Sequence, residues 1–188
     1  VMGFADKETV QRVELFLNDF NIHPEDRRVV GPAWQAARKA QELNKGNEGI
    51  YCGAAIELKD GAIITGNNSP LMHASSSLIL HAIKSLADIP HKITLLPSYI
   101  TDSVRNMKTD ILNEKSISLD LEETLIALSI SATTNPAAQL AIEKLKELRG
   151  CEVHITHIPT PGDEAGLRRL GVNLTSEPNF STNDLFLA

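Results

Sequence analysis

The chain has 188 residues, of which 42% are hydrophobic and 22% are charged, as is typical of a globular domain that buries a core. Its formal net charge of −6 argues against nucleic acid as a partner, because a nucleic-acid backbone attracts basic surfaces. No apolar run is long enough to span a membrane, no secretory leader is visible, and Cys52 and Cys151 match no metal or disulfide spacing, so we expect a cytoplasmic protein with free thiols and no membrane contact.

The first quarter of the chain is predicted to be helical. Apolar residues recur at helical spacing over residues 7–20, which predicts an amphipathic helix. A second helix is predicted over residues 25–43, with an interruption at Gly31. We therefore divide the chain into an N-terminal helical segment, residues 1–48, and an α/β domain, residues 49–188.

The α/β domain opens with a predicted hairpin. Residues 53–58 and 62–65 read as two strands, and Gly61 between them suits the positive φ angle of a tight turn. Ser69 and Pro70 then place a capping residue before a proline, which predicts the start of a helix.

The rest of the chain alternates between strands and helices. Asn135 and Pro136 repeat the signal of a cap followed by proline, and an apolar stripe follows it at helical spacing as far as Leu148. Strands are predicted over 91–96, 152–156 and 172–175, and further helices over 99–112, 122–131 and 162–170. These elements predict an α/β fold with a mixed sheet flanked by helices. The predicted core includes Ala54, Ile56, Ile63, Leu78, Ala138, Ala141, Ile142, Leu145 and Leu148.

Two runs of sequence resemble a known bacterial family. ALSISATTNPAAQLAIEKLKELRGCEVHITH from Ala127 and LRRLGVNLTSEP from Leu167 resemble the C-terminal region of DUF1846, a family of unknown function, and the resemblance extends from Lys7 to about Pro178. It implies that the chain, which begins at Val1, is the C-terminal part of a larger bacterial protein. The N-terminal region of that protein would then be a partner of this domain.

The order of elements also resembles the cytidine-deaminase fold. In that fold a hairpin leads to a helix bearing H/C-x-E, and a later helix begins with P-C-x-x-C. The first motif falls on His73-Ala74-Ser75 and the second on residues 136–140, so one metal ligand of three is retained and Ser75 replaces the glutamate. The resemblance implies a three-layer, deaminase-like arrangement without zinc, and we predict no metal, no cofactor and no catalytic constellation in this chain.

The remaining histidines give no alternative metal site. His73 and His81 would lie about 12 Å apart along a helix, too far to share one ion. His154 and His157 differ by an odd number of residues and would face opposite sides of a strand. No HExxH sequence or phosphate-binding glycine loop occurs, so we expect histidines that lie at the surface or in hydrogen bonds.

The two polar runs before predicted helices are the candidate binding site. In the deaminase fold two helix starts converge, and there Asn67, Ser69, Thr134 and Asn135 would surround a site for an anion such as phosphate or carboxylate. The alternative is that these residues only cap helices.

We therefore predict a zinc-free, deaminase-like domain that serves ligand binding or assembly, as a homo-oligomer. One alternative is an enzyme that acts on a nucleotide or another anionic small molecule, with an active site shared with the N-terminal region. A metal-dependent hydrolase, a label given to some members of the family, has the least support because the ligands are missing.

Overall fold

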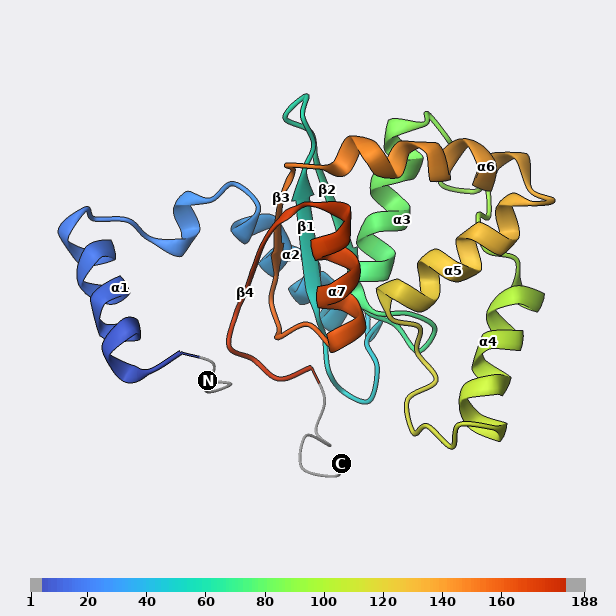
Figure 1. Cartoon of the computed structure of the whole chain (residues 1–188), viewed down its shortest axis with the longest axis horizontal. Helices are drawn as coiled ribbons and strands as arrows, with labels where there is room; N and C mark the ends of the chain where they lie inside the picture. The colour runs from blue at the N-terminus through green and yellow to red at the C-terminus, as the bar shows by residue number, and fades with distance from the viewer. Residues whose placement is uncertain (1–4, 182–188) are drawn as a thin grey trace.

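The computed structural model describes residues 5–181 and shows an α/β fold around one mixed sheet (Figure 1). The strands are β1 (Gly53–Glu57), β2 (Ile63–Asn67), β3 (Glu152–Ile155) and β4 (Asn173–Ser176), in the order β2-β1-β3-β4. β1 is antiparallel to both of its neighbours, and β3 is parallel to β4. The predicted hairpin and the last two predicted strands are confirmed.

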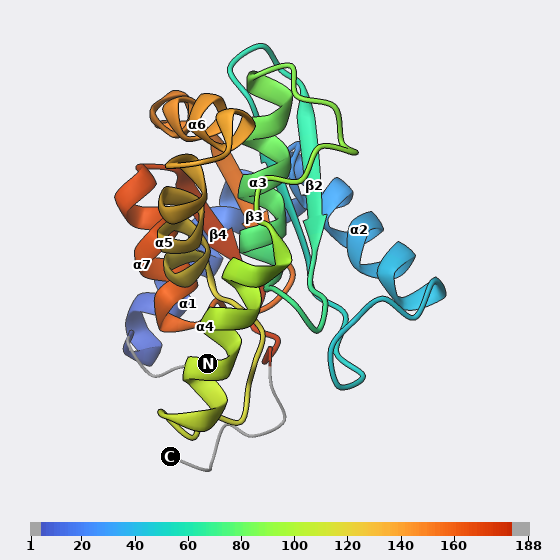
Figure 2. The ribbon, with the colours of Figure 1, turned by 90° about the vertical axis from the view of Figure 1, so that its right-hand side faces the viewer.

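Helices cover both faces of this sheet (Figure 2). On one face, α2 (Val30–Glu42) packs against β1 and β2 and buries Val29 and Ala33 against Ala55. On the other face, α3 (Ala74–Leu86) packs against the same two strands, and Ala54 and Ile56 enter the main core. The alternation of Ala54, Ala55 and Ile56 between two apolar layers explains why β1 is apolar on both faces.

A group of helices extends the core on the α3 side of the sheet. α5 (Leu121–Ala132) packs against α4 (Ser98–Asp110), α6 (Pro136–Glu143) and α7 (Pro161–Leu170), and a 3-10 helix, η2 (Lys144–Leu148), continues α6. The four helices predicted in this part of the chain are confirmed. No helix among residues 5–181 combines the length and apolar character that a membrane crossing needs.

The N-terminal segment divides into two different parts. α1 (Lys7–Asp19) has no buried residue and stands apart from the sheet in Figure 1. A short 3-10 helix, η1 (Pro24–Asp26), follows it, whereas α2 packs on the sheet as part of the α/β fold. The boundary after residue 48 stays a prediction, and the packing of α2 is an argument for an earlier one.

Three predictions of local structure are wrong. Residues 91–96 form no strand; Leu95 and Leu96 are buried by the helices, and the Leu95 carbonyl accepts a hydrogen bond from Ser131 Oγ at 2.6 Å. These two leucines are apolar because they are buried in a loop, not because the segment is extended in a sheet. The helical interruption lies at residues 27–29, and Gly31 is inside the first turn of α2.

The third error concerns the start of α3. Ser69 closes a turn instead, because its Oγ accepts hydrogen bonds from the N–H groups of Leu71 and Met72 at 3.2 Å. The helix begins at Ala74, with His73 as its N-cap. The cap-then-proline pattern is therefore satisfied locally by a turn, which uses the same side-chain hydrogen bonds as a helix cap.

The predicted core is well supported by the structure. The fully buried members are Ala54, Ile56, Leu78, Ala138, Ala141 and Leu148, and Ile63, Ile142 and Leu145 are partly buried. Gly66 of β2 allows α3 to approach the strand closely, because a Cβ atom there would clash with the backbone of Leu78.

Candidate functional site

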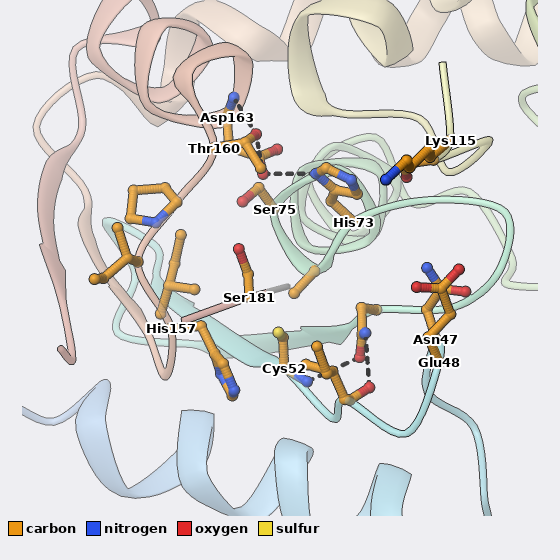
Figure 3. Close-up of a pocket in the computed structure, with 17 residues that line it drawn as sticks. Asn47, Glu48, Cys52, His73, Ser75, Lys115, His157, Thr160, Asp163 and Ser181 are labelled. Carbon is orange, nitrogen blue, oxygen red and sulfur yellow. Dashed lines mark hydrogen bonds and ion pairs between the residues drawn. The ribbon is translucent and has the colours of Figure 1, made fainter. Parts of the chain in front are cut away.

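A cavity of about 270 Å³ opens where α3 and α7 begin (Figure 3). Its walls come from the loop before β1, the start of α3, the loop after β3 and the start of α7. The polar and ionisable side chains that line it are Asn47, Glu48, Cys52, Asn68, His73, Ser75, Lys115, Ser116, His157, Thr160, Asp163 and Ser181. Segments far apart in the sequence thus bring their polar residues to one place.

The central feature of this cavity is a pair formed by His73 and Asp163. Nδ1 of His73 lies 2.8 Å from Oδ2 of Asp163, a residue 90 positions later in the chain. The backbone N–H of His73 donates to the carbonyl of Leu119 at 2.9 Å, which holds the residue at the start of α3. A carboxylate accepts hydrogen bonds, so Nδ1 carries the proton and Nε2 is the ring nitrogen left for a ligand.

Asp163 is fixed by hydrogen bonds from three directions. It is only 4% exposed, in the first turn of α7. Besides His73, it accepts from Thr160 Oγ1 at 2.9 Å and from the N–H of Leu121 at 3.0 Å. Because Leu121 begins α5, this one carboxylate joins the starts of α3, α5 and α7. The positive ends of these helices favour a negative charge there.

Gly162 permits this close packing of helix starts. A Cβ atom at this position would clash with the carboxylate of Asp120, the N-cap of α5. A residue with a side chain here would therefore force either the capping Asp120 carboxylate or the start of α7 to move.

The charges around His73 favour its protonated form. Burial lowers the pKa of His73, but the hydrogen bond and charge of Asp163, helped by the charge of Asp120, raise it more. Lys108 opposes this effect weakly, and the net result is a pKa above the ordinary value of 6.5. Asp163 therefore extends the protonated form of the imidazole to higher pH than in a free histidine.

Cys52 lines the cavity but is not an activated thiol. Burial, together with the negative charge of Asp163, raises the pKa of Cys52 to about 12. Its backbone is tied to Asn68, which accepts from Cys52 N at 2.8 Å and donates its own N–H to Cys52 O at 3.1 Å. A thiol with so high a pKa is a poor nucleophile at neutral pH. Both Cys52 and Cys151 are free and buried, as expected from the sequence.

His157 forms part of the wall next to the sheet. Its Nδ1 lies 2.9 Å from Thr156 Oγ1, which in turn accepts from the N–H of Gly53. Burial lowers the pKa of His157, against the charge of Glu177. Across residues 5–181, no three His, Cys, Asp or Glu side chains come together as ligands for one metal ion.

The four residues predicted to bind an anion fall into two separate segments, the end of β2 with the loop after it and the loop before α6. Asn67 and Ser69 lie before α3, where the Asn67 amide donates to the carbonyls of Lys45 and Asn68. Asn135 caps α6 and donates to the carbonyl of Thr94 at 2.9 Å, in the loop after α3, and Thr134 beside it is exposed. In Figure 1, α3 begins low in the molecule, whereas α6 begins at the right-hand edge. Anion binding by these four residues stays a prediction without support from their positions.

Two helix starts do converge, but the second belongs to α7 and not to α6. Thr160 and Pro161 carry the same cap-then-proline signal as Asn135 and Pro136, and Thr160 caps α7 through the N–H of Asp163. Sequence reasoning identified His73 as a retained ligand position but missed Asp163 as its partner. The available signal was Asp163 itself, a carboxylate two residues after Pro161 in the first turn of a capped helix.

The comparison with known proteins identifies the family. Residues 25–186 match the family described as domain of unknown function DUF1846, C-terminal. The chain belongs to this family. It is 44% identical over 184 residues to a UPF0371 protein of Clostridium botulinum, covering 98% of this chain and 36% of the relative.

A UPF0371 protein of Clostridium tetani is 41% identical over the same length, again with 36% of the relative covered. The chain therefore spans little more than a third of the length of these bacterial relatives. The family resemblance drawn from the sequence is confirmed, and the names of these relatives state no activity.

Proposed function

We propose that this domain binds a small anionic molecule in the cavity at the starts of α3 and α7, with His73 as the cationic contact. The observation that carries the proposal is the His73–Asp163 pair on the cavity wall. Asp163 orients the imidazole, maintains its proton and is itself fixed by Thr160 and Leu121. A ring held in this way loses little side-chain entropy when Nε2 meets a ligand.

Other lining groups support an anion as the ligand. Lys115 adds a second basic side chain to the wall, and Ser75 and Asn47 add a hydroxyl and an amide. Two carboxylates also line the cavity: Asp163 is paired with His73, and Glu48 works against an anion at this site. The volume is slightly below the range of about 300 to 1,000 Å³ that drug-sized ligands occupy, so a small carboxylate or phosphate fits the site better than a nucleotide.

Calorimetric titration with inorganic phosphate, pyrophosphate, malonate and citrate tests this proposal. At least one should bind, with an affinity that falls as the pH rises through the raised pKa of His73. His73→Gln should weaken binding at least tenfold, and His23→Gln, at the start of η1, is the matched control. Equal binding by wild type and His73→Gln would contradict the proposal.

We also propose that the arrangement is deaminase-like and free of zinc. The hairpin β1–β2 leads to α3 with His73 at its start, and α7, which begins with Pro161, meets it. If P-C-x-x-C is placed on Pro161, the positions of the two cysteines hold Gly162 and Ala165, which have no ligand atoms. Metal analysis of the purified protein should find no stoichiometric zinc, and an ion bound by His73 and two other side chains would overturn this.

The second candidate is an enzyme whose active site is completed by the rest of a longer protein. A histidine oriented by a buried carboxylate is a common acid/base pair, and relatives extend well beyond the 36% of their length that this chain matches. Hydrolysis of nucleotides and phosphate esters by a full-length relative tests it. Activity that disappears when the histidine aligned with His73 is changed to Gln would favour the enzyme.

Self-assembly in the cytoplasm is a further proposal. Ile126 and Ile130 of α5 are 61% and 52% exposed, and Leu140 of α6 is 56% exposed, so the outer surface of these helices has apolar side chains that an interface would bury. Light scattering of a full-length relative should give a homo-oligomer, and a monomer at all accessible concentrations would exclude it.

A further inference from the structure

A second groove, of about 510 Å³, follows the free edge of β2. β2 is the outermost strand of the sheet, and its far side has no neighbouring strand in the described part of the chain. Figure 2 looks toward this edge, with α3 on one side of β2 and α2 on the other. The groove is independent of the cavity at His73, with which it shares no lining residue.

The backbone of β2 directs hydrogen-bonding groups into this groove. Asn68, just after the strand, donates its N–H toward β1, to Cys52 O at 3.1 Å. In an antiparallel pair, alternate residues turn their N–H and C=O to opposite sides. Ile63, Thr65 and Asn67 therefore point theirs away from β1, toward the groove.

A side-chain contact supports this orientation. His81 of α3 lies outside the sheet, and its Nδ1 donates to the carbonyl of Thr65 at 2.9 Å. The Thr65 carbonyl is therefore on the groove side, and so is the N–H of the same residue. His81 occupies one acceptor of the edge in the way that an added strand would.

The ionisable side chains in the groove are all basic. They are Lys39, Lys45, His81 and His91, and no Asp or Glu is among the described residues that line it. Lys39 and Lys45 are exposed, and neither forms an ion pair with another residue in the range 5–181. The groove therefore has a local basic surface although the chain as a whole has a net charge of −6.

We propose that this groove binds an extended acidic peptide segment, which adds to the sheet as a strand beside β2. Backbone groups of Ile63, Thr65 and Asn67 would pair with the segment, and its carboxylates would meet Lys39 and Lys45. An N–H of the segment replaces His81 at the Thr65 carbonyl.

The charges select this occupant over a second copy of the chain. Two β2 edges paired with each other would bring two sets of the same lysines together, and like charges facing one another oppose association. A free anion would use the lysines but not the backbone edge. An acidic strand uses both features.

Fluorescence anisotropy with a labelled Glu-Val-Glu-Val-Glu-Val peptide and the full chain tests the charge requirement. The peptide should bind, more weakly as salt is added, and the Lys-Val-Lys-Val-Lys-Val peptide should not. Lys39→Glu with Lys45→Glu should weaken binding at least tenfold. Lys146→Glu, on the exposed side of η2, should leave it unchanged. Equal binding of both peptides would overturn the proposal.

Thr65→Pro tests the strand pairing. Proline removes the N–H that faces the groove and is tolerated on the open side of an edge strand. Binding should be lost in Thr65→Pro and kept in Thr65→Val, which retains the N–H. If Thr65→Pro bound the peptide with wild-type affinity, or if inorganic phosphate displaced the labelled peptide as effectively as unlabelled peptide does, the groove would be an anion site only and the proposal would be overturned.

Hydrogen exchange on the wild-type chain decides the question if Thr65→Pro fails to fold. Bound peptide should slow exchange of the Thr65 amide, while an amide already paired within α3 serves as the internal control. Unchanged exchange at Thr65 in the presence of saturating peptide would overturn strand pairing.

Discussion

Replacing Asp163 by Asn should lower both the pKa of His73 and the free energy of unfolding. The substitution keeps the shape of the side chain but removes its charge. Burial already lowers the pKa of His73, and the hydrogen bond and charge of Asp163 are the largest influences that raise it. Without them the pKa of His73 should fall below its value in the wild type.

The loss of stability follows from the three hydrogen bonds that Asp163 accepts. A hydrogen bond to a charged group contributes about 1.5 to 3 kcal/mol, against about 0.5 to 1.5 kcal/mol for a neutral pair. The amide can still accept from Leu121, so the contacts with His73 and Thr160 are the ones chiefly weakened. We expect Asp163→Asn to lower the free energy of unfolding by about 2 to 3 kcal/mol at a pH where His73 is charged in the folded protein.

The sign of the pH dependence provides a stricter test. The pKa of His73 is higher in the folded protein than in the unfolded chain, where it is about 6.5. The contribution of protonated His73 to the free energy of unfolding is therefore fully present below pH 6.5 and is lost as the pH rises through the folded pKa. The difference in unfolding free energy between wild type and Asp163→Asn should therefore shrink at alkaline pH. Urea denaturation at several pH values, with an NMR titration of the His73 ring, measures both. An unchanged pKa of His73 in the variant would refute the reasoning.

Three further expectations concern packing and pH. Leu148→Ala should cost about 2 to 5 kcal/mol in denaturant unfolding because the side chain is fully buried, and Leu145→Ala should cost less because it is only partly buried. Gly66→Ala should destabilise the protein by at least about 1 to 3 kcal/mol through its clash with α3, whereas Gly31→Ala, which meets nothing within 4 Å, should be neutral or stabilising. Burial lowers the pKa of His154 in the folded protein. The neutral ring therefore contributes to the free energy of unfolding above pH 6.5, about the pKa in the unfolded chain, and this contribution is lost as the pH falls through the folded pKa. His154→Gln should make the thermal unfolding temperature less sensitive to acid.

Helices and strands with a clear period were predictable from the sequence. The apolar stripe of α6 and η2 and the alternation across the hairpin are local, and burial follows from them directly. Residues 91–96 show the limit of this approach. Leu95 and Leu96 are buried in the main core, and a short apolar run has the same sequence pattern whether it forms a strand or a packed loop.

The candidate site was less predictable than these elements. His73 was noted as a retained ligand position through the resemblance to the deaminase fold, but it was not predicted as a site residue. Asp163 could not be paired with it from the sequence, because that contact spans 90 residues and depends on how α4, α5 and α6 are accommodated between α3 and β3. Local patterns specify helix starts, but topology decides which starts meet.

The three cap-then-proline sequences make this argument concrete. Ser69-Pro70 closes a turn, Asn135-Pro136 begins a helix beside the loop after α3, and Thr160-Pro161 begins the helix that meets His73. All three satisfy backbone N–H groups in the same way, so no local energy distinguishes them. The distinction comes from β3, which returns the chain to the centre of the sheet beside β1 and delivers α7 to the end of the sheet where α3 begins. A buried carboxylate in the first turn of that helix is then within reach of a histidine at the start of the other, and this long-range placement creates the site.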